Sequence, residues 1–212
     1  MNDLSLLETR VLGTLVEKQH TVPDTYPLTL NALVSGCNQK TSRSPVMEAS
    51  ETEVQATLDN LKRRNLVIES SGGRVARYAH NVDSVLKVPS QSVAILTVLM
   101  LRGPQTPGEL RINCERLHRF ADLSAVEAFL EELAARPAGA LVVQLARLPG
   151  ARENRWAHLL SGTPSVNTTP RERAERDPRD ETSDRKTLET RVAQLESEVA
   201  ELRAELDKLR LQ

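Results

Sequence analysis

The sequence predicts a mainly α-helical protein with small β-hairpins. An amphipathic helical pattern occurs twice, at 54–64 and 126–136, with Val, Leu and Leu at positions i, i+4 and i+7 of each copy. This spacing places one apolar stripe on a helix. Each copy is followed by a β-rich stretch with a glycine-containing turn, which is typical of a hairpin. Helices that lead into a last helix and then a hairpin have the order of a winged helix, so we expect two tandem winged-helix domains.

We expect four segments along the 212 residues. They are winged-helix domain 1 at 1–83, winged-helix domain 2 at 88–160, a disordered linker at 161–184 and a C-terminal coiled-coil helix at 185–212. A chain of this length has room for two small domains and a tail. Aromatic residues make up only 2% of it. The cores must therefore be filled by Leu, Val, Ile and Ala, which suits small helical modules.

Local signals define the elements of domain 1. Ser5-x-x-Glu8 is a capping box that opens the first helix, and Ser50-x-x-Glu53 opens the third. The remaining elements are a turn between Pro23 and Pro27, a second helix at about 28–37, a polar loop at 38–45, and strands at 66–69 and 74–78 around Ser71-Gly72-Gly73.

Domain 2 repeats this order with one difference. Its first helix contains 93–101, which is apolar on every side. We therefore expect this helix to be buried on every side, packed against domain 1 or against a second subunit. The other elements are a helix opened by Thr106 and Glu109, a helix opened by the capping box Ser124-x-x-Glu127, and a hairpin of 141–147 and 155–160.

The two cysteines fall at matching points of the two domains. Cys37 and Cys114 each lie near the end of a predicted second helix, and neither has the spacing of a metal ligand. A free cysteine behaves as a small hydrophobic residue. We expect both to be buried structural thiols rather than a disulfide.

The composition of the chain changes at residue 161. The stretch 161–184 contains three prolines and alternating charges, with too little apolar surface to offset the entropy of ordering it. The tail then shows heptad spacing at Leu188, Val192, Leu195, Val199, Leu202, Leu206 and Leu209. Leu at every d position and Val at two a positions favour a parallel two-stranded coiled coil, so we expect a homodimer. The alternative is a surface helix that packs on its own domain.

Several motifs resemble a known family. They are Leu7-Glu8-Thr9-Arg10-Val11-Leu12-Gly13, Pro23-Asp24-Thr25-Tyr26-Pro27-Leu28-Thr29-Leu30-Asn31-Ala32-Leu33, Cys37-Asn38-Gln39-Lys40-Thr41-Ser42-Arg43, and Leu101-Arg102-Gly103-Pro104-Gln105-Thr106-Pro107-Gly108-Glu109-Leu110-Arg111. They are similar to the YceH-like family of uncharacterised bacterial proteins, over about residues 4–160. The resemblance implies a tandem winged-helix fold in a bacterial cytoplasm and no established activity.

Catalysis is not expected. The sequence has no glycine-rich phosphate loop, no nucleophile elbow and no cluster of metal ligands, so we expect neither a cofactor nor a metal. The longest uncharged apolar run, at 93–101, is about half of what a bilayer span requires. No basic and then apolar leader opens the chain. We expect a cytoplasmic protein.

Binding of double-stranded DNA is the leading hypothesis. A winged helix normally offers its third helix to the major groove and its wing to the flanking backbone. In domain 1 the candidate contacts are Asn38, Gln39, Lys40, Arg43, Lys62, Arg63, Arg74 and Arg77, whose cations suit phosphate groups. Against this, residues 1–160 hold 18 Lys and Arg against 17 Asp and Glu, which is not a strong nucleic-acid footprint. The alternative is a solvated turn and a charged surface helix.

Domain 2 has a different charge pattern. Glu127, Glu131 and Glu132 lie on its third helix, where they would repel phosphates. Its basic residues cluster instead around its second helix and in its hairpin, at Arg111, Arg116, His118, Arg119, Arg147, Arg152 and Arg155. The two domains therefore cannot use the same face for DNA. The alternative function is a non-catalytic protein-interaction scaffold, with tandem winged helices and a dimerising coiled coil.

Overall fold

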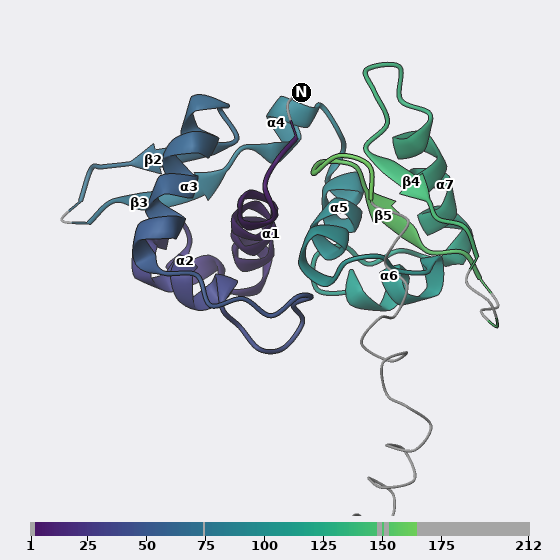
Figure 1. Ribbon diagram of the computed structural model, residues 1–212, viewed down its shortest axis with the longest axis horizontal. Helices are drawn as coiled ribbons and strands as arrows, with labels where there is room; N and C mark the ends of the chain where they lie inside the picture. Colours follow the sequence, from purple (N-terminus) through teal and green to yellow (C-terminus); the bar gives the residue numbers. More distant parts are fainter. Residues whose placement is uncertain (1–2, 74, 148–149, 151–152, 165–212) are drawn as a thin grey trace, which may run out of the picture. The chain divides into compact units, whose positions relative to one another are not determined.

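The computed structural model describes residues 3–73, 75–147, 150 and 153–164. Contacts join these described residues into one compact unit. Within the described residues this unit is mainly helical, with seven α-helices and two small antiparallel sheets (Figure 1). The predicted coiled-coil helix lies outside the described residues, and so does the predicted linker beyond residue 164.

The first half of the unit ends in a three-stranded sheet. Its elements are α1 (Leu6–Thr21), the 3-10 helix η1 (Pro23–Thr25), β1 (Leu28–Thr29), α2 (Leu30–Cys37), α3 (Glu51–Arg63), β2 (Val67–Ser70) and β3 (Arg77–His80). The strand order is β1-β3-β2, and both pairings are antiparallel. Leu28 pairs with Tyr78, and Val67 pairs with His80. The predicted hairpin is therefore present, with its second strand at Arg77–His80 rather than at 74–78 and with a third short strand added at its edge.

The second helix is shorter than predicted. Thr29 is its N-cap, because the Thr29 side chain accepts a hydrogen bond from the Ala32 amide at 3.3 Å. Leu28 and Thr29 have extended backbone and pair with β3. The prediction of a helix from residue 28 was therefore wrong by two residues, since a strand pairing that involves residues 77 and 78 occupies this segment.

The second half repeats the order of the first. Its elements are α5 (Ser90–Arg102), α6 (Pro107–Asn113), α7 (Leu123–Ala134), β4 (Val142–Gln144) and β5 (Trp156–His158). Gln105 forms an isolated antiparallel bridge with Trp156, in the place that β1 takes in the first half. A short helix that the sequence did not predict, α4 (Val82–Leu86), connects the two halves.

Three of the helix starts are those read from the sequence. Capping boxes at Ser5, Ser50 and Thr106 are confirmed, each with reciprocal bonds to the glutamate three residues later. The box predicted at Ser124 was wrong. Asp122 caps α7 instead, because its carboxylate accepts a hydrogen bond from the Ala125 amide at 2.8 Å. A carboxylate two residues earlier gives the stronger acceptor for the positive end of the helix.

Helix α5 is the centre of the unit, as its apolar sequence predicts. All ten residues of Ser92–Leu101 are buried, and α5 lies beside α1 (Figure 1). Gly13 permits this close approach, since a Cβ at this position would lie 2.9 Å from Leu101 Cδ2. Each fully buried Leu or Val side chain contributes roughly 1.5–3 kcal/mol. The partner of the all-apolar helix is the first half, one of the two alternatives that its sequence left open. Cys37 and Cys114 are both buried free thiols, as predicted.

Candidate functional site: the polar loop and the pocket between the halves

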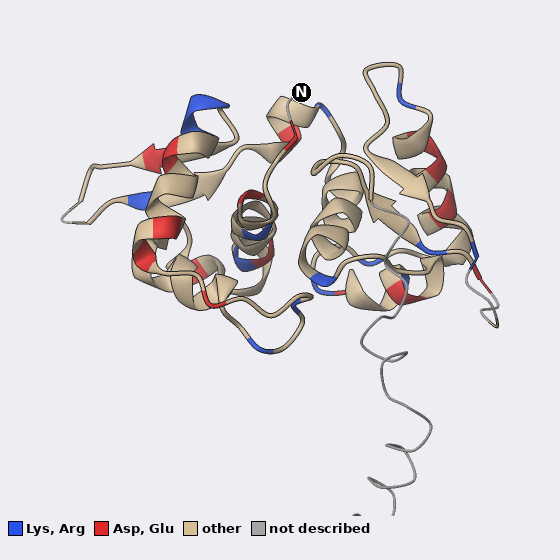
Figure 2. Ribbon diagram, viewed as in Figure 1, with Lys and Arg blue, Asp and Glu red and all other residues tan. Residues whose placement is uncertain are grey.

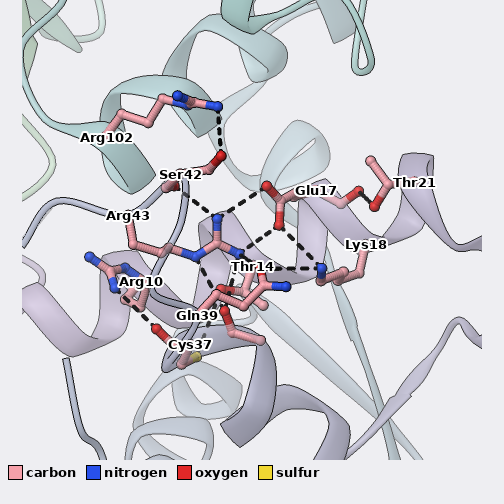
Figure 3. A network of polar contacts seen from close by, with 11 residues as sticks. Arg10, Thr14, Glu17, Lys18, Thr21, Cys37, Gln39, Ser42, Arg43 and Arg102 are labelled. Atoms are coloured by element: carbon pink, nitrogen blue, oxygen red, sulfur yellow. Dashed lines mark hydrogen bonds and ion pairs between the residues drawn. The ribbon is translucent and has the colours of Figure 1, made fainter. Parts of the chain in front are cut away.

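The predicted polar loop after α2 is held by a buried arginine. The guanidinium of Arg43 donates to both carboxylate oxygens of Glu17 on α1, at 3.1 and 2.6 Å, to the carbonyl of Gly36 at 3.1 Å and to Gln39 Oε1 at 2.8 Å (Figure 3). The side chain of Arg43 has no exposed area. Such a bidentate, charge-assisted pair fixes geometry as well as contributing energy.

A second buried arginine holds the two ends of the loop. Arg10 of α1 donates to the carbonyl of Cys37 at 3.1 Å and to the carbonyl of Pro45 at 2.7 Å. Burial lowers the pKa of Arg10, and the nearby charge of Arg43 lowers it further. The Cys37 carbonyl belongs to the last residue of α2, where the partial negative charge of the helix end favours a cation. Arg10 therefore caps α2 from the interior.

The loop also binds the second half of the unit. The Ser44 amide donates to the carbonyl of Leu101 at 2.8 Å, and Arg102 Nη2 donates to the Ser42 hydroxyl at 2.8 Å. Ser42 has a φ of 59°, a left-handed conformation that is uncommon for a residue other than glycine. The contacts on both sides of Ser42 hold it there. The loop therefore contacts both α1 of the first half and α5 of the second half, and it lies at the boundary between the halves.

A pocket of about 190 Å³ opens beside this loop. Its lining comes from α1, the loop, α5, α6 and the turn that follows α6: Glu17, Lys18, Thr21, Gln39, Thr41, Ser42, Val98, Leu101, Arg102, Asn113, Arg116 and Leu117. Three of these side chains are cations and one is a carboxylate. Val98, Leu101 and Leu117 make one wall apolar. The pocket thus combines a positive rim with a small hydrophobic surface.

Most of the predicted DNA contacts have partners within the chain. Asn38 bonds both the amide and the carbonyl of Ala49 at 2.8 Å, while Gln39 accepts bonds from Lys18 and Arg43. These two residues and Arg43 therefore hold the loop together. The buried guanidinium of Arg43 is not presented to solvent, so the loop has one cation fewer for phosphate contacts than its sequence indicates.

The remaining candidates differ in exposure. Lys62 pairs with Asp59 at 2.8 Å and with Glu69 at 2.5 Å, and these bonds raise its pKa. Arg77 donates to the carbonyls of Thr25 and Pro27. Lys40 and Arg63 are exposed; Arg63 bonds Asn60, and Lys40 has no polar partner among the described residues. Arg74 lies outside the described residues.

Sequence reasoning missed Arg10 and Glu17 as parts of this site. Both are charged residues of α1. They are seven positions apart, which is about two helical turns, so they lie on the same face of the helix. Arg10 interrupts the apolar stripe of α1, and a charge within a buried stripe is a detectable signal of an internal partner. Their partners at residues 36–45 are set by the tertiary fold, so the sequence alone does not identify them.

The third helices of the two halves carry different charge (Figure 2). The exposed residues of α7 include Glu127, Glu131 and Glu132, and its cap is Asp122. Helix α3 instead has Glu51 and Glu53 in its first turn and Lys62 and Arg63 in its last. Like charges repel, so α7 is unsuited to phosphate groups, whereas α3 can approach them only with its C-terminal turn.

No group of three or more His, Cys, Asp or Glu side chains among the described residues could hold a metal ion. No helix in the same residues is long and apolar enough to cross a membrane.

The structure defines a class of mainly helical protein with two similar halves, joined through α1, α5 and the polar loop. The chain belongs to the family described as "Protein of unknown function, DUF480", whose model matches residues 4–151. It is 65% identical over 192 residues to a UPF0502 protein of Dechloromonas aromatica, covering 91% of this chain and 89% of that protein. It is also 65% identical over 162 residues to a UPF0502 protein of Burkholderia orbicola, covering 76% and 68%. The resemblance read from the sequence is consistent with this bacterial family.

Proposed function

We propose that the protein is a tandem winged-helix regulatory protein that associates with duplex DNA through its first half. The observation that carries the proposal is the three-stranded sheet of order β1-β3-β2, which packs against α1, α2 and α3. In a winged helix the third helix and the turn between the last two strands are presented together to DNA. The bridge between Gln105 and Trp156 supports a second winged helix, built on α5, α6 and α7.

Topology alone does not define a function, so the proposal also depends on charge. Lys40 and Arg63 are exposed cations of the first half, and Arg74 lies between β2 and β3 in the sequence. Glu51 and Glu53 occupy the first turn of α3, where a reading helix normally contacts base edges. Phosphate contacts should therefore dominate, and the binding should be salt-dependent with little sequence preference.

We propose that the second half binds another protein rather than DNA. Glu127, Glu131 and Glu132 are exposed on α7 and would be repelled by phosphates. The same carboxylates are complementary to a basic protein surface. This favours protein interaction as a second function, carried by α7, and it keeps the two functions on different halves of one unit.

We further propose that the tail forms a parallel two-stranded coiled coil. The heptad positions from Leu188 to Leu209 lie outside the described residues, so the proposal depends on the sequence pattern. A dimer would present two first halves to one duplex. Two linked contacts raise the apparent affinity without any new interaction, which suits a module with few exposed cations.

Fluorescence anisotropy with a random-sequence duplex tests the DNA proposal. The full chain should bind at low salt, and three phosphate contacts predict a slope of log K against log salt of about −3 per first half. Lys40→Glu with Arg63→Glu should weaken binding by at least about tenfold, because each reversal replaces attraction by repulsion. The matched control is Arg119→Glu with Arg147→Glu, which makes the same charge change at exposed positions of the second half.

The control should change the affinity by less than about twofold. Equal weakening by both pairs would show general electrostatics rather than a surface on the first half, and would contradict the proposal. So would the absence of any binding by the wild-type chain at low salt. Circular dichroism of each variant verifies that the helices are intact.

A further inference from the structure

We infer that the pocket between the halves is a binding site for a small anion that carries phosphate or carboxylate groups. This inference concerns a different surface from α3 and does not depend on DNA binding. It follows from the charge balance of the pocket, the partners of its side chains and its size.

The charge balance of the pocket is positive. Glu17 is the only acidic residue that lines it, and both oxygens of that carboxylate accept bonds from Arg43 at 3.1 and 2.6 Å. The Glu17–Arg43 pair is therefore neutral as a unit. Three cations of the lining remain, Lys18, Arg102 and Arg116, so the pocket carries an excess of positive charge.

These three cations are not matched by other carboxylates. Lys18 Nζ lies 3.6 Å from the Glu17 carboxylate, which Arg43 already occupies, and donates to the neutral Gln39 amide. Arg102 donates to the neutral Ser42 hydroxyl. Arg116 is exposed, with no polar partner among the described residues. An anion placed among them would gain charge-assisted hydrogen bonds, and a guanidinium suits phosphate and carboxylate groups in particular.

The lining also fits the rest of a small ligand. Thr41, Ser42 and Asn113 offer hydroxyl and amide groups, and Val98, Leu101 and Leu117 offer an apolar wall for a short carbon skeleton. A volume of about 190 Å³ is below the roughly 300–1,000 Å³ of sites for drug-sized ligands. The site therefore suits inorganic phosphate, or a compact phosphorylated or polycarboxylate metabolite, and excludes a dinucleotide.

Binding at this place has a structural consequence. Lys18 belongs to α1 of the first half, whereas Arg102 and Arg116 belong to the second. An anion that contacts all three would bridge the halves and relieve the repulsion between the cations. A ligand that binds only the folded state raises its stability, so anion binding should raise the unfolding temperature.

The test uses the full chain with inorganic phosphate and with citrate, at constant ionic strength set by potassium chloride. Isothermal titration calorimetry gives the affinity, and thermal unfolding gives the stabilisation. Arg116→Gln removes an exposed cation of the pocket that the second half contributes, and Lys18→Gln removes one that α1 contributes. Arg111→Gln is the matched control, since Arg111 is an exposed arginine of α6 outside the pocket.

We expect saturable binding with a stoichiometry of one per chain. Arg116→Gln and Lys18→Gln should each weaken it at least about tenfold, the loss of one charge-assisted contact. Arg111→Gln should leave it within about twofold. Stronger binding of phosphate than of citrate assigns a phosphorylated ligand, and the reverse assigns a polycarboxylate.

Two results would overturn the inference. One is the absence of heat and of thermal stabilisation with both anions up to about 20 mM, where a millimolar site would be nearly saturated. The other is equal weakening by Arg111→Gln and Arg116→Gln, which would show non-specific screening. Neither result bears on duplex binding through Lys40 and Arg63, so the two proposals fail independently.

Discussion

The guanidinium of Arg43 forms a bidentate pair with the carboxylate of Glu17, and the Arg43 side chain has no exposed area. In the sequence Arg43 belongs to a polar loop that has the composition of a phosphate-contacting turn. In the structure it is an internal support of that loop. The same pair neutralises Glu17 at the wall of the pocket, so it shapes the loop and leaves the pocket positive.

Removal of the Glu17 charge should destabilise the fold strongly. In Glu17→Gln the buried Arg43 keeps its charge and loses its carboxylate, which costs about 3 kcal/mol of unfolding free energy. Urea unfolding followed by circular dichroism measures this loss. The matched control is Asp59→Asn, which breaks the surface pair with Lys62 and should leave the midpoint nearly unchanged. Equal midpoints for wild type and Glu17→Gln would contradict a structural role for the pair.

The contact between α1 and α5 can be tested at Gly13. An added Cβ would lie 2.9 Å from Leu101, so Gly13→Ala should cost about 1 kcal/mol net, overpacking being partly offset by the better helix propensity of alanine. In a Leu101→Ala background the clash is absent, and the same substitution should stabilise by about 0.5–1 kcal/mol. A double-mutant cycle in urea measures the coupling. The same effect in both backgrounds would show that Leu101 is not the limiting neighbour.

Stability should fall in mild acid because of His158. Burial lowers the pKa of His158 to about 4, and its Nδ1 has no hydrogen-bond partner among the described residues. The unfolded state binds a proton below pH of about 6.5, but the folded state does so only near 4, so stability is full above about 6.5 and falls as the pH decreases. Between pH 7 and 4.5 the wild type should lose about 2–3 kcal/mol more than His158→Leu.

Urea unfolding of both chains at the two pH values measures this difference. His80 is present in both chains, and burial also lowers its pKa, against the opposing effect of Asp83. A residual slope in His158→Leu is therefore expected. Parallel losses in wild type and variant would mean that His158 is solvated in the folded state.

The proposed coiled coil can be tested separately from the compact unit. Lysine at both Val199 and Leu202 places charges in the apolar seam, which should abolish self-association of the tail without changing the thermal unfolding of the rest. Sedimentation of the full chain, of this variant and of a chain ending at Ser161 gives the masses. Equal masses for the full and shortened chains would show that the tail does not hold a dimer.

Local chemistry explains what could be predicted from the sequence. The capping boxes at Ser5, Ser50 and Thr106 are confirmed because a cap and its partner are three residues apart and need no distant contact. The buried helix at 93–101 is confirmed because a segment without a polar face has no alternative to burial. The repeated order of helices and hairpin could be predicted because the apolar spacing i, i+4 and i+7 occurs at both 54–64 and 126–136.

Among the described residues, the sequence by itself thus determined six of the seven helices, the starts of three of them and the interior position of α5. Only the tertiary structure decided that Arg43 is internal, that Arg10 caps α2, and that Lys18 and Arg116 share a pocket. The physical reason is the separation along the chain between the residues that interact. A cap or an apolar stripe depends on neighbours within one or two turns, whereas the partner of a buried charge depends on which distant segment the packing brings beside it. Arg43 and Glu17 are 26 residues apart, and only the packing of the loop against α1 brings them together.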